Sequence, residues 1–162
     1  MILSGAKKQI GFTFIELVIT LAIMSVLVLV AVPLAQISVQ RDKERELREN
    51  LADIREALDA FKRASDQGRV QVKVGESGYP KELDDLVSGI SDQRSPSKRD
   101  IYFLRSLPRD PMSPHDVENP AETWDIRSYA SPPDDPREGE DVFDVHSKSK
   151  KLGLNGVAYD KW

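Results

Sequence analysis

The chain has no cysteine and only two histidines, and these absences exclude several classes of function. Without thiols there is no disulfide scaffold, no thiolate zinc site and no thiol nucleophile. The two histidines, His115 and His146, lie far apart in the sequence, which argues against a histidine-based catalytic or metal centre. A basic excess is also lacking, because 23 Lys and Arg stand against 27 Asp and Glu, for a net charge of -4. The composition therefore argues against an enzyme and against a nucleic-acid partner.

Charge is missing altogether from residues 17–35, although charged residues make up 31% of the chain. A helix of this length spans roughly 28 Å, about the thickness of the hydrocarbon core of a bilayer. Lys7 and Lys8 precede the stretch and the next basic residue is Arg41, so the positive-inside rule keeps the start of the chain in the cytoplasm. A cleaved secretory signal is the alternative, but the apolar run is long and no convincing small-x-small cleavage site ends it. The sequence favours a retained single span.

Two residues of this apolar segment are energetically awkward. Glu16 lies at its edge, and a carboxylate at the centre of a bilayer costs roughly 3 kcal/mol. Pro33 cannot donate a hydrogen bond to the Leu29 carbonyl, a loss of about 3 kcal/mol inside a soluble helix. Glu16 either reaches the lipid headgroups or pairs with a cation from another chain, and neighbouring helices can satisfy the Leu29 carbonyl. Both residues suit a helix that packs in a bundle of its own kind.

A short basic leader ending in Gly11 and followed by FTFIELVITLAIM resembles the class III signal of type IV pilins and type II secretion pseudopilins. The resemblance implies that prepilin peptidase cuts after Gly11 and methylates the new amino terminus, Phe12. It also places Glu16 at the glutamate position of the family and Pro33 at its helix-breaking proline position. In that family the glutamate pairs with the amino terminus of a neighbouring subunit during assembly. Such a pair neutralises two charges that are each costly in a low dielectric.

The apolar pattern continues beyond the membrane segment as a narrow stripe. Steps of four and three alternate along it, and no Gly or Pro interrupts residues 36–66, which predicts one continuous helix over about 12–64. The stripe either faces a small head or seeds a dimeric coiled coil. It lasts only about two heptads, which favours the core-facing interpretation. Its members are Leu47, Leu51, Ile54, Leu58 and Phe61.

Charged residues dominate the start of this second half of the helix. The run 41–49 is predicted to form a solvated face, the usual place for such runs. Opposite charges four residues apart predict ion pairs along the surface. The predicted pairs are Glu44–Arg48, Arg45–Glu49 and Asp59–Arg63.

Residues 67–162 are predicted to form a small α+β head. Pro80 predicts the start of a short helix, and the polar residues 88–100 predict an exposed loop. Short strands are predicted over 123–130 and 141–147, while residues 69–74 fit either a strand or a loop.

The order of motifs in the head resembles that of the major pseudopilin of type II secretion. Tyr79-Pro80 comes first, then the Leu-Pro-Arg-Asp-Pro turn at 107–111, then Trp124 and the segment 141–162. The resemblance implies a short helix after the YP pair and a small antiparallel sheet after the turn.

The C-terminal segment departs from that family, whose loop is rich in Gly and Asp and binds calcium. Calcium takes six to eight oxygen ligands, typically including several carboxylates. Here residues 147–160 carry three lysines and a single carboxylate, which favours a structural turn over a calcium site. The candidate calcium ligands are Ser147, Asn155 and Asp160.

The sequence thus predicts four parts in a type IV pilin-like α+β fold: a cleaved leader (1–11), a transmembrane and filament-core half of the helix (12–35), a periplasmic half (36–66) and a globular head (67–162). It predicts a single-pass protein of the bacterial inner membrane, with its start in the cytoplasm and its head in the periplasm, that assembles into a periplasmic or surface filament. The expected partners are further copies and other pilins or pseudopilins, prepilin peptidase, the inner-membrane assembly platform and, before assembly, membrane lipid.

The expected function is structural, with no catalytic residue, and the major pseudopilin of type II secretion fits the motifs best. Two alternatives stay open. One is a type IV pilin or minor pilin used for adhesion, motility or DNA uptake. The other is a single-pass anchor whose periplasmic domain binds a partner without polymerising.

Overall fold

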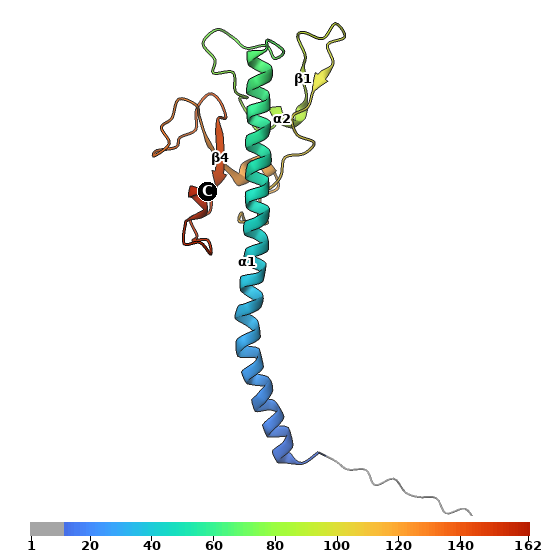
Figure 1. Ribbon diagram of the computed structural model, residues 1–162, viewed down its shortest axis with the longest axis vertical. Coiled ribbons are helices and arrows are strands. Elements are labelled where there is room, and N and C mark those ends of the chain that lie inside the picture. Colours follow the sequence, from blue (N-terminus) through green and yellow to red (C-terminus); the bar gives the residue numbers. More distant parts are fainter. Residues whose placement is uncertain (1–11) are drawn as a thin grey trace, which may run out of the picture. The chain divides into compact units, whose positions relative to one another are not determined.

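The computed structural model describes residues 12–162, and the chain divides between Gln40 and Arg41 into two compact units. Helix α1 (Phe14–Asp66) contributes to both units, which are described separately below (Figure 1). The predicted leader, with Gly11 and the cleavage after it, lies outside the described residues. Its boundary and the predicted end of the membrane segment at residue 35 stay predictions.

The described part of the first unit is helical from Phe14 onward and exposes its apolar side chains. An 18-residue window of α1 has a mean hydropathy of 2.9, and the helix is long and apolar enough to cross a membrane. The hydroxyls of Thr20 and Ser25 donate to the carbonyls of Leu17 and Leu21, at 2.9 and 2.8 Å. Hydroxyls bonded back to the helix in this way need no water, so this surface suits contact with lipid or with other helices.

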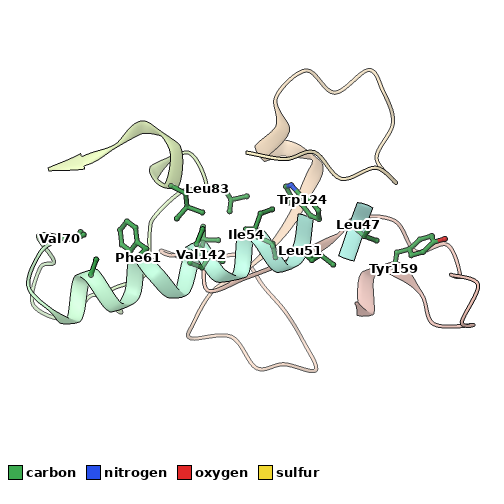
Figure 2. Packing of buried hydrophobic residues seen from close by; sticks show 14 residues of the cluster. Leu47, Leu51, Ile54, Phe61, Val70, Leu83, Trp124, Val142 and Tyr159 are labelled. Carbon is green, nitrogen blue, oxygen red and sulfur yellow. The ribbon is translucent and has the colours of Figure 1, made fainter. Parts of the chain in front are cut away.

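The second unit is built around residues 41–66 of α1. All five residues of the predicted stripe are buried, with exposed fractions of 0 to 4%, which confirms that the stripe faces the head. In Figure 2 the labelled members of the stripe, Leu47, Leu51, Ile54 and Phe61, lie among the buried residues of the head. A coiled coil through the same stripe is incompatible with this packing. The head residues in the core are Val70, Leu83, Leu86, Trp124, Val142, Val145 and Tyr159.

The head contains short elements connected by long loops. Its class is α+β, as predicted, with two antiparallel two-stranded sheets, β1–β2 and β3–β4. In the second sheet Trp124 lies opposite Ser147 and Arg127 opposite Asp144. The elements are α2 (Asp85–Ser88), β1 (Ile90–Ser91), β2 (Asp100–Ile101), the 3-10 helix η1 (Pro120–Thr123), β3 (Trp124–Arg127), β4 (Asp144–Ser147) and the 3-10 helix η2 (Tyr159–Lys161).

Two local predictions in the head were wrong or incomplete, and one open alternative is decided. The helix expected after Pro80 begins only at Asp85, because the Asp85 carboxylate accepts the N–H groups of Lys81 and Glu82 at 3.0 and 3.2 Å and holds them in a turn. Residues 88–100, expected as a loop, contain β1 and the first residue of β2. Residues 69–74, which fitted a strand or a loop, contain no strand.

The predicted ion pairs along α1 form only in part. Arg48 lies 3.9 Å from Glu44, but Arg45 pairs with Asp42 at 2.9 Å rather than with Glu49. Side chains of a helix lean toward its N-terminus, so Arg45 reaches the preceding turn. Among residues 12–162, the predicted pair between residues 59 and 63 does not form.

The loop after α1 is fastened to the β1–β2 hairpin by a buried carboxylate. Arg69 donates to Asp92 Oδ2 from Nε at 3.0 Å and from Nη2 at 2.8 Å, and Arg94 N–H donates to Oδ1 at 3.0 Å. The hydrogen bonds from Arg69 lower the pKa of the Asp92 carboxyl below its ordinary value. A carboxyl with a lowered folded-state pKa stabilises the fold above its unfolded-state pKa, and this stability is lost as the pH falls through the folded-state value.

We therefore expect Asp92→Asn to reduce the acid sensitivity of the head. For the wild-type chain in detergent, the free energy of unfolding should fall as the pH drops below about 4, and this fall should be smaller in the variant. Fluorescence of Trp124 and Trp162, the chain's two tryptophans, follows denaturant unfolding at each pH. Asp84→Asn, at an exposed position, is the matched control. An unchanged acid response in Asp92→Asn would contradict the assignment.

Candidate functional site

The start of α1 forms a capping box between Thr13 and Glu16. The Glu16 N–H donates to Thr13 Oγ1 at 3.3 Å, and the Thr13 N–H donates to Glu16 Oε2 at 3.4 Å. The Thr13 hydroxyl lies 3.5 Å from the same carboxylate oxygen. A Thr-x-x-Glu pair at a helix start satisfies two backbone N–H groups reciprocally, and the negative charge is favourable at the N-terminal end of the helix dipole.

This arrangement gives Glu16 a partner within its own chain that the sequence analysis overlooked. The signal was present, because Thr13 and Glu16 have the capping-box spacing just before an apolar run. In the described part of the chain, no Lys, Arg or His nitrogen lies within 4 Å of the Glu16 carboxylate. The carboxylate is therefore hydrogen-bonded at one oxygen but has no counter-ion within residues 12–162.

The predicted processing residue Phe12 lies just before the same exposed helix, and the predicted assembly residue Pro33 lies within it. Phe12 is 86% exposed and precedes the capping box. Pro33 lies inside α1, and the residues on both sides of it are helical. The exposed apolar side chains on this segment are of the kind that need either lipid or a protein partner around them.

Two of the candidate calcium ligands are engaged within the chain, while the third, Asp160, has a buried carboxylate oxygen, Oδ1, without a hydrogen-bond partner among the described residues. Ser147 is buried and its hydroxyl donates to Asp110 Oδ2 at 2.5 Å, while Asn155 Oδ1 accepts the N–H of Val157 at 3.0 Å. Among residues 12–162 there is no group of three or more His, Asp or Glu side chains placed to hold a metal ion. Together with the three lysines between residues 148 and 151, these contacts do not fit calcium, and we derive no role for it.

Glu44 of α1 holds the C-terminal loop instead. Its Oε1 accepts the N–H of Leu154 at 2.7 Å and the hydroxyl of Tyr159 at 2.9 Å. The Glu44 side chain is only 4% exposed, so the prediction that residues 41–49 form a solvated face is wrong at this position. Glu44 lies three residues before Leu47, on the line of the apolar stripe, and this spacing was the signal that could have identified it.

Arg55, on the next turns of α1, fastens β4 and the end of the chain. Its Nε donates to Asp144 Oδ1 at 2.8 Å, and Nη2 donates to the carbonyls of Val145 and Trp162, both at 3.0 Å. The Trp162 ring in turn packs edge-on against Tyr159 and under the guanidinium of Arg48, which lies 4.4 Å from the ring centroid. Helix α1 thus holds the C-terminal segment through the negatively charged side chain of Glu44 and the positively charged side chains of Arg48 and Arg55.

The Leu-Pro-Arg-Asp-Pro turn lies against the second sheet. The Asp110 carboxylate, 2% exposed, accepts the N–H of Met112 at 2.7 Å and the hydroxyl of Ser147 at 2.5 Å. The indole N–H of Trp124 donates to the carbonyl of Pro108 at 2.9 Å. The turn, the start of β3 and the end of β4 therefore meet at one place, although they are distant in the sequence.

Comparison with known proteins adds one finding at the start of the chain. Residues 6–32 match the family described as the prokaryotic N-terminal methylation motif. No curated protein and no solved structure matches the chain. The chain therefore carries the amino-terminal signal of type IV pilin-like prepilins, and this signal implies processing by prepilin peptidase and assembly with other pilins.

We expect Glu44→Ala to loosen the C-terminal loop and to lower the free energy of unfolding by about 2 kcal/mol, because the buried hydroxyl of Tyr159 and the partly buried N–H of Leu154 lose their acceptor. Tyr159→Phe removes one of the two bonds without leaving a donor and should cost about 1 kcal/mol. Denaturant unfolding of the full chain in detergent, followed by tryptophan fluorescence, measures both.

Glu46→Ala, at an exposed position two residues away, is the matched control and should change stability by less than about 0.5 kcal/mol. Equal stability of Glu44→Ala and Glu46→Ala would show that the Glu44 contacts do not hold the loop.

Proposed function

We propose that this chain is a structural, non-catalytic subunit of a pilus-like filament, and specifically the major pseudopilin of a type II secretion system. The observation that carries the proposal is the methylation motif at 6–32, which continues directly into an exposed apolar helix that begins with a carboxylate. In this proposal the subunit first resides in the inner membrane with its head in the periplasm. It then polymerises, and the growing filament drives export of folded proteins.

The exposed surface of residues 14–39 supports polymerisation. Large apolar side chains cover every side of this helix segment, with exposed fractions from 39 to 82%. A helix that is apolar all round is found within a membrane or inside a bundle of helices. In our proposal it occupies both environments in turn, first lipid and then the core of the filament, where sister helices also satisfy the carbonyl that Pro33 leaves without its helical donor.

Glu16 supports the same assembly step. In our proposal its carboxylate pairs with the methylated amino terminus, Phe12, of a neighbouring subunit. The capping box uses Oε2, so Oε1 stays available for the incoming ammonium. Removing two opposite charges from water as a pair costs less free energy than removing either charge alone. The pair forms only where the two groups meet, so it sets the register between subunits.

The contacts of the head support the finer assignment to a major pseudopilin. The motif residues that carry this resemblance are brought together, since Pro108 and Asp110 of the turn bond to Trp124 and Ser147 of the second sheet. Tyr79 also packs against Tyr129 and Phe143 at centroid distances of 5.8 and 5.0 Å. These motif residues thus contribute to the packing of the head.

Intact-mass measurement of the purified chain tests the processing step. We expect a chain that begins at Phe12 and is heavier than the unmodified sequence by one methyl group. The mature mass should disappear in cells that lack the prepilin peptidase. An uncut chain, or one cut elsewhere, would support a single-pass anchor or a secreted domain instead.

Paired substitutions at the capping box test the role of Glu16. Gln can replace Glu in a capping box, so Glu16→Gln keeps the helix start but removes the charge. Thr13→Ala removes the cap, at a cost of about 1 kcal/mol, but keeps the charge. We expect filaments and protein export to be lost in Glu16→Gln and retained in Thr13→Ala. Electron microscopy of sheared cells and an export assay measure the two outcomes.

Both variants must reach the membrane with the mature mass, which separates assembly from insertion and processing. Normal filaments from Glu16→Gln combined with loss of filaments from Thr13→Ala would mean that Glu16 acts only as a helix cap. If filaments form in the wild type and are lost in Glu16→Gln but export is the same in both, a type IV pilin would be favoured over a pseudopilin.

A further inference from the structure

The C-terminal loop of the head exposes an apolar patch with lysines beside it. Leu152, Leu154 and Val157 are 67, 45 and 44% exposed, the first two being separated by a single buried glycine. Lys150 and Lys151 directly precede them and are exposed. Within residues 12–162, no carboxylate oxygen lies within 4 Å of the ammonium group of either lysine. We call residues 150–157 the basic loop.

The basic loop is held rigidly although its side chains face outward. Leu152 and Ala158 form an antiparallel bridge, and the Gly153 N–H donates to the carbonyl of Val157 at 2.9 Å. The Leu154 N–H donates to the buried carboxylate of Glu44 at 2.7 Å. An apolar surface that is ordered before binding loses little conformational entropy when a partner covers it, which suits a docking surface.

The same head carries a surface of complementary chemistry. A hollow of about 1060 Å³ lies between the segments 75–81 and 128–141. Five carboxylates and two cations line it, for a net charge of -3, and the ring of Tyr129, 61% exposed, adds an apolar wall. In the described part of the chain, no cation lies within 4 Å of the carboxylates of Glu138 and Glu140. We call this the acidic hollow; its charged residues are Glu76, Asp135, Glu138, Glu140, Asp141, Lys81 and Arg137.

The two surfaces lie at different levels along α1, so they do not meet within one head. The basic loop is hydrogen-bonded to Glu44. Beside the hollow, Gly78 lies close to the side chain of Lys62, because a Cβ atom added to Gly78 would be 3.3 Å from Lys62 Nζ. Glu44 and Lys62 are 18 residues apart on one helix, about 27 Å at 1.5 Å per residue. In Figure 1 the dark red C-terminal loop and the orange loop before β4 lie at these two levels beside the helix.

We propose that the basic loop of one subunit docks into the acidic hollow of the next copy of this chain. Lysines 150 and 151 then face the carboxylates of Glu138 and Glu140, and the leucines of the loop contact the ring of Tyr129. The two surfaces are different, so the contact is heterologous and repeats along an open filament instead of closing a dimer. The inference rests on the proposed function, because it names the contact between heads in that filament.

Cysteine cross-linking in the full chain, expressed in its own host, tests the contact. The chain has no cysteine, so Pro132→Cys at the hollow and Leu152→Cys on the loop supply the only thiols. Under oxidation we expect the double variant to give a ladder of dimers, trimers and longer species. The two single variants expressed together should stop at dimers. Ser97→Cys with Leu152→Cys, which uses an exposed residue of the β1–β2 hairpin, is the matched control and should give no ladder.

Charge reversal in the cross-linking variant tests the pairing of the two surfaces. K150E/K151E alone and E138K/E140K alone should each lower the yield of the ladder by about fivefold or more, because like charges then face each other. The two reversals together should restore it. The proposal would be overturned if K150E/K151E lowers the yield of the ladder, E138K/E140K alone does not lower it, and the combination does not restore it. The lysines would then be assigned to another surface, such as anionic lipid.

The outcome separates this inference from the proposed function. Filaments that form from the cysteine variants without any ladder would overturn the docking contact and leave the proposed function standing. A wild-type chain that forms no filament would overturn the proposed function, and with it this contact.

Discussion

Burial of one apolar stripe on α1 is the interaction on which the head depends. Sheets of two strands are marginally stable alone, and both sheets of the head have only two. Each fully buried side chain of the stripe contributes roughly 1.5–3 kcal/mol, and the stripe from Leu47 to Phe61 belongs to the same buried cluster as the core residues of the head. The helix is therefore the scaffold on which the loops and strands become ordered, rather than an appendage to a self-sufficient domain.

Charged side chains of the same helix complete this scaffold where apolar packing ends. Glu44 accepts two donors from the C-terminal segment, and Arg55 donates to β4 and to the last residue. These bonds lie beside the core, where a paired polar group strengthens a fold and an unpaired one weakens it. The C-terminal segment is thus ordered by the chain's own side chains, at the place where its resemblance had implied calcium.

The sequence predicted those parts of the structure that carry a strong repeating pattern. Steps of three and four identified α1 and its buried stripe, and the strands expected over 123–130 and 141–147 are present as the shorter β3 and β4. The β1–β2 hairpin was missed because two-residue strands carry no periodic signal and are held by the side-chain contacts of Asp92. Glu44 does lie on the line of the apolar stripe, but it was missed because a carboxylate is expected in water and its burial depends on a loop 110 residues away in the sequence.

The capping box at the start of α1 has a consequence for the energetics of joining a polymer. The Glu16 carboxylate already accepts hydrogen bonds from Thr13, and these offset part of the cost of removing its charge from water. The positively charged amino terminus of a neighbouring subunit would then contact a Glu16 carboxylate whose orientation the helix cap already fixes. In the proposed filament, a neighbour therefore joins or leaves without unwinding the start of the helix, because the cap does not depend on the incoming charge.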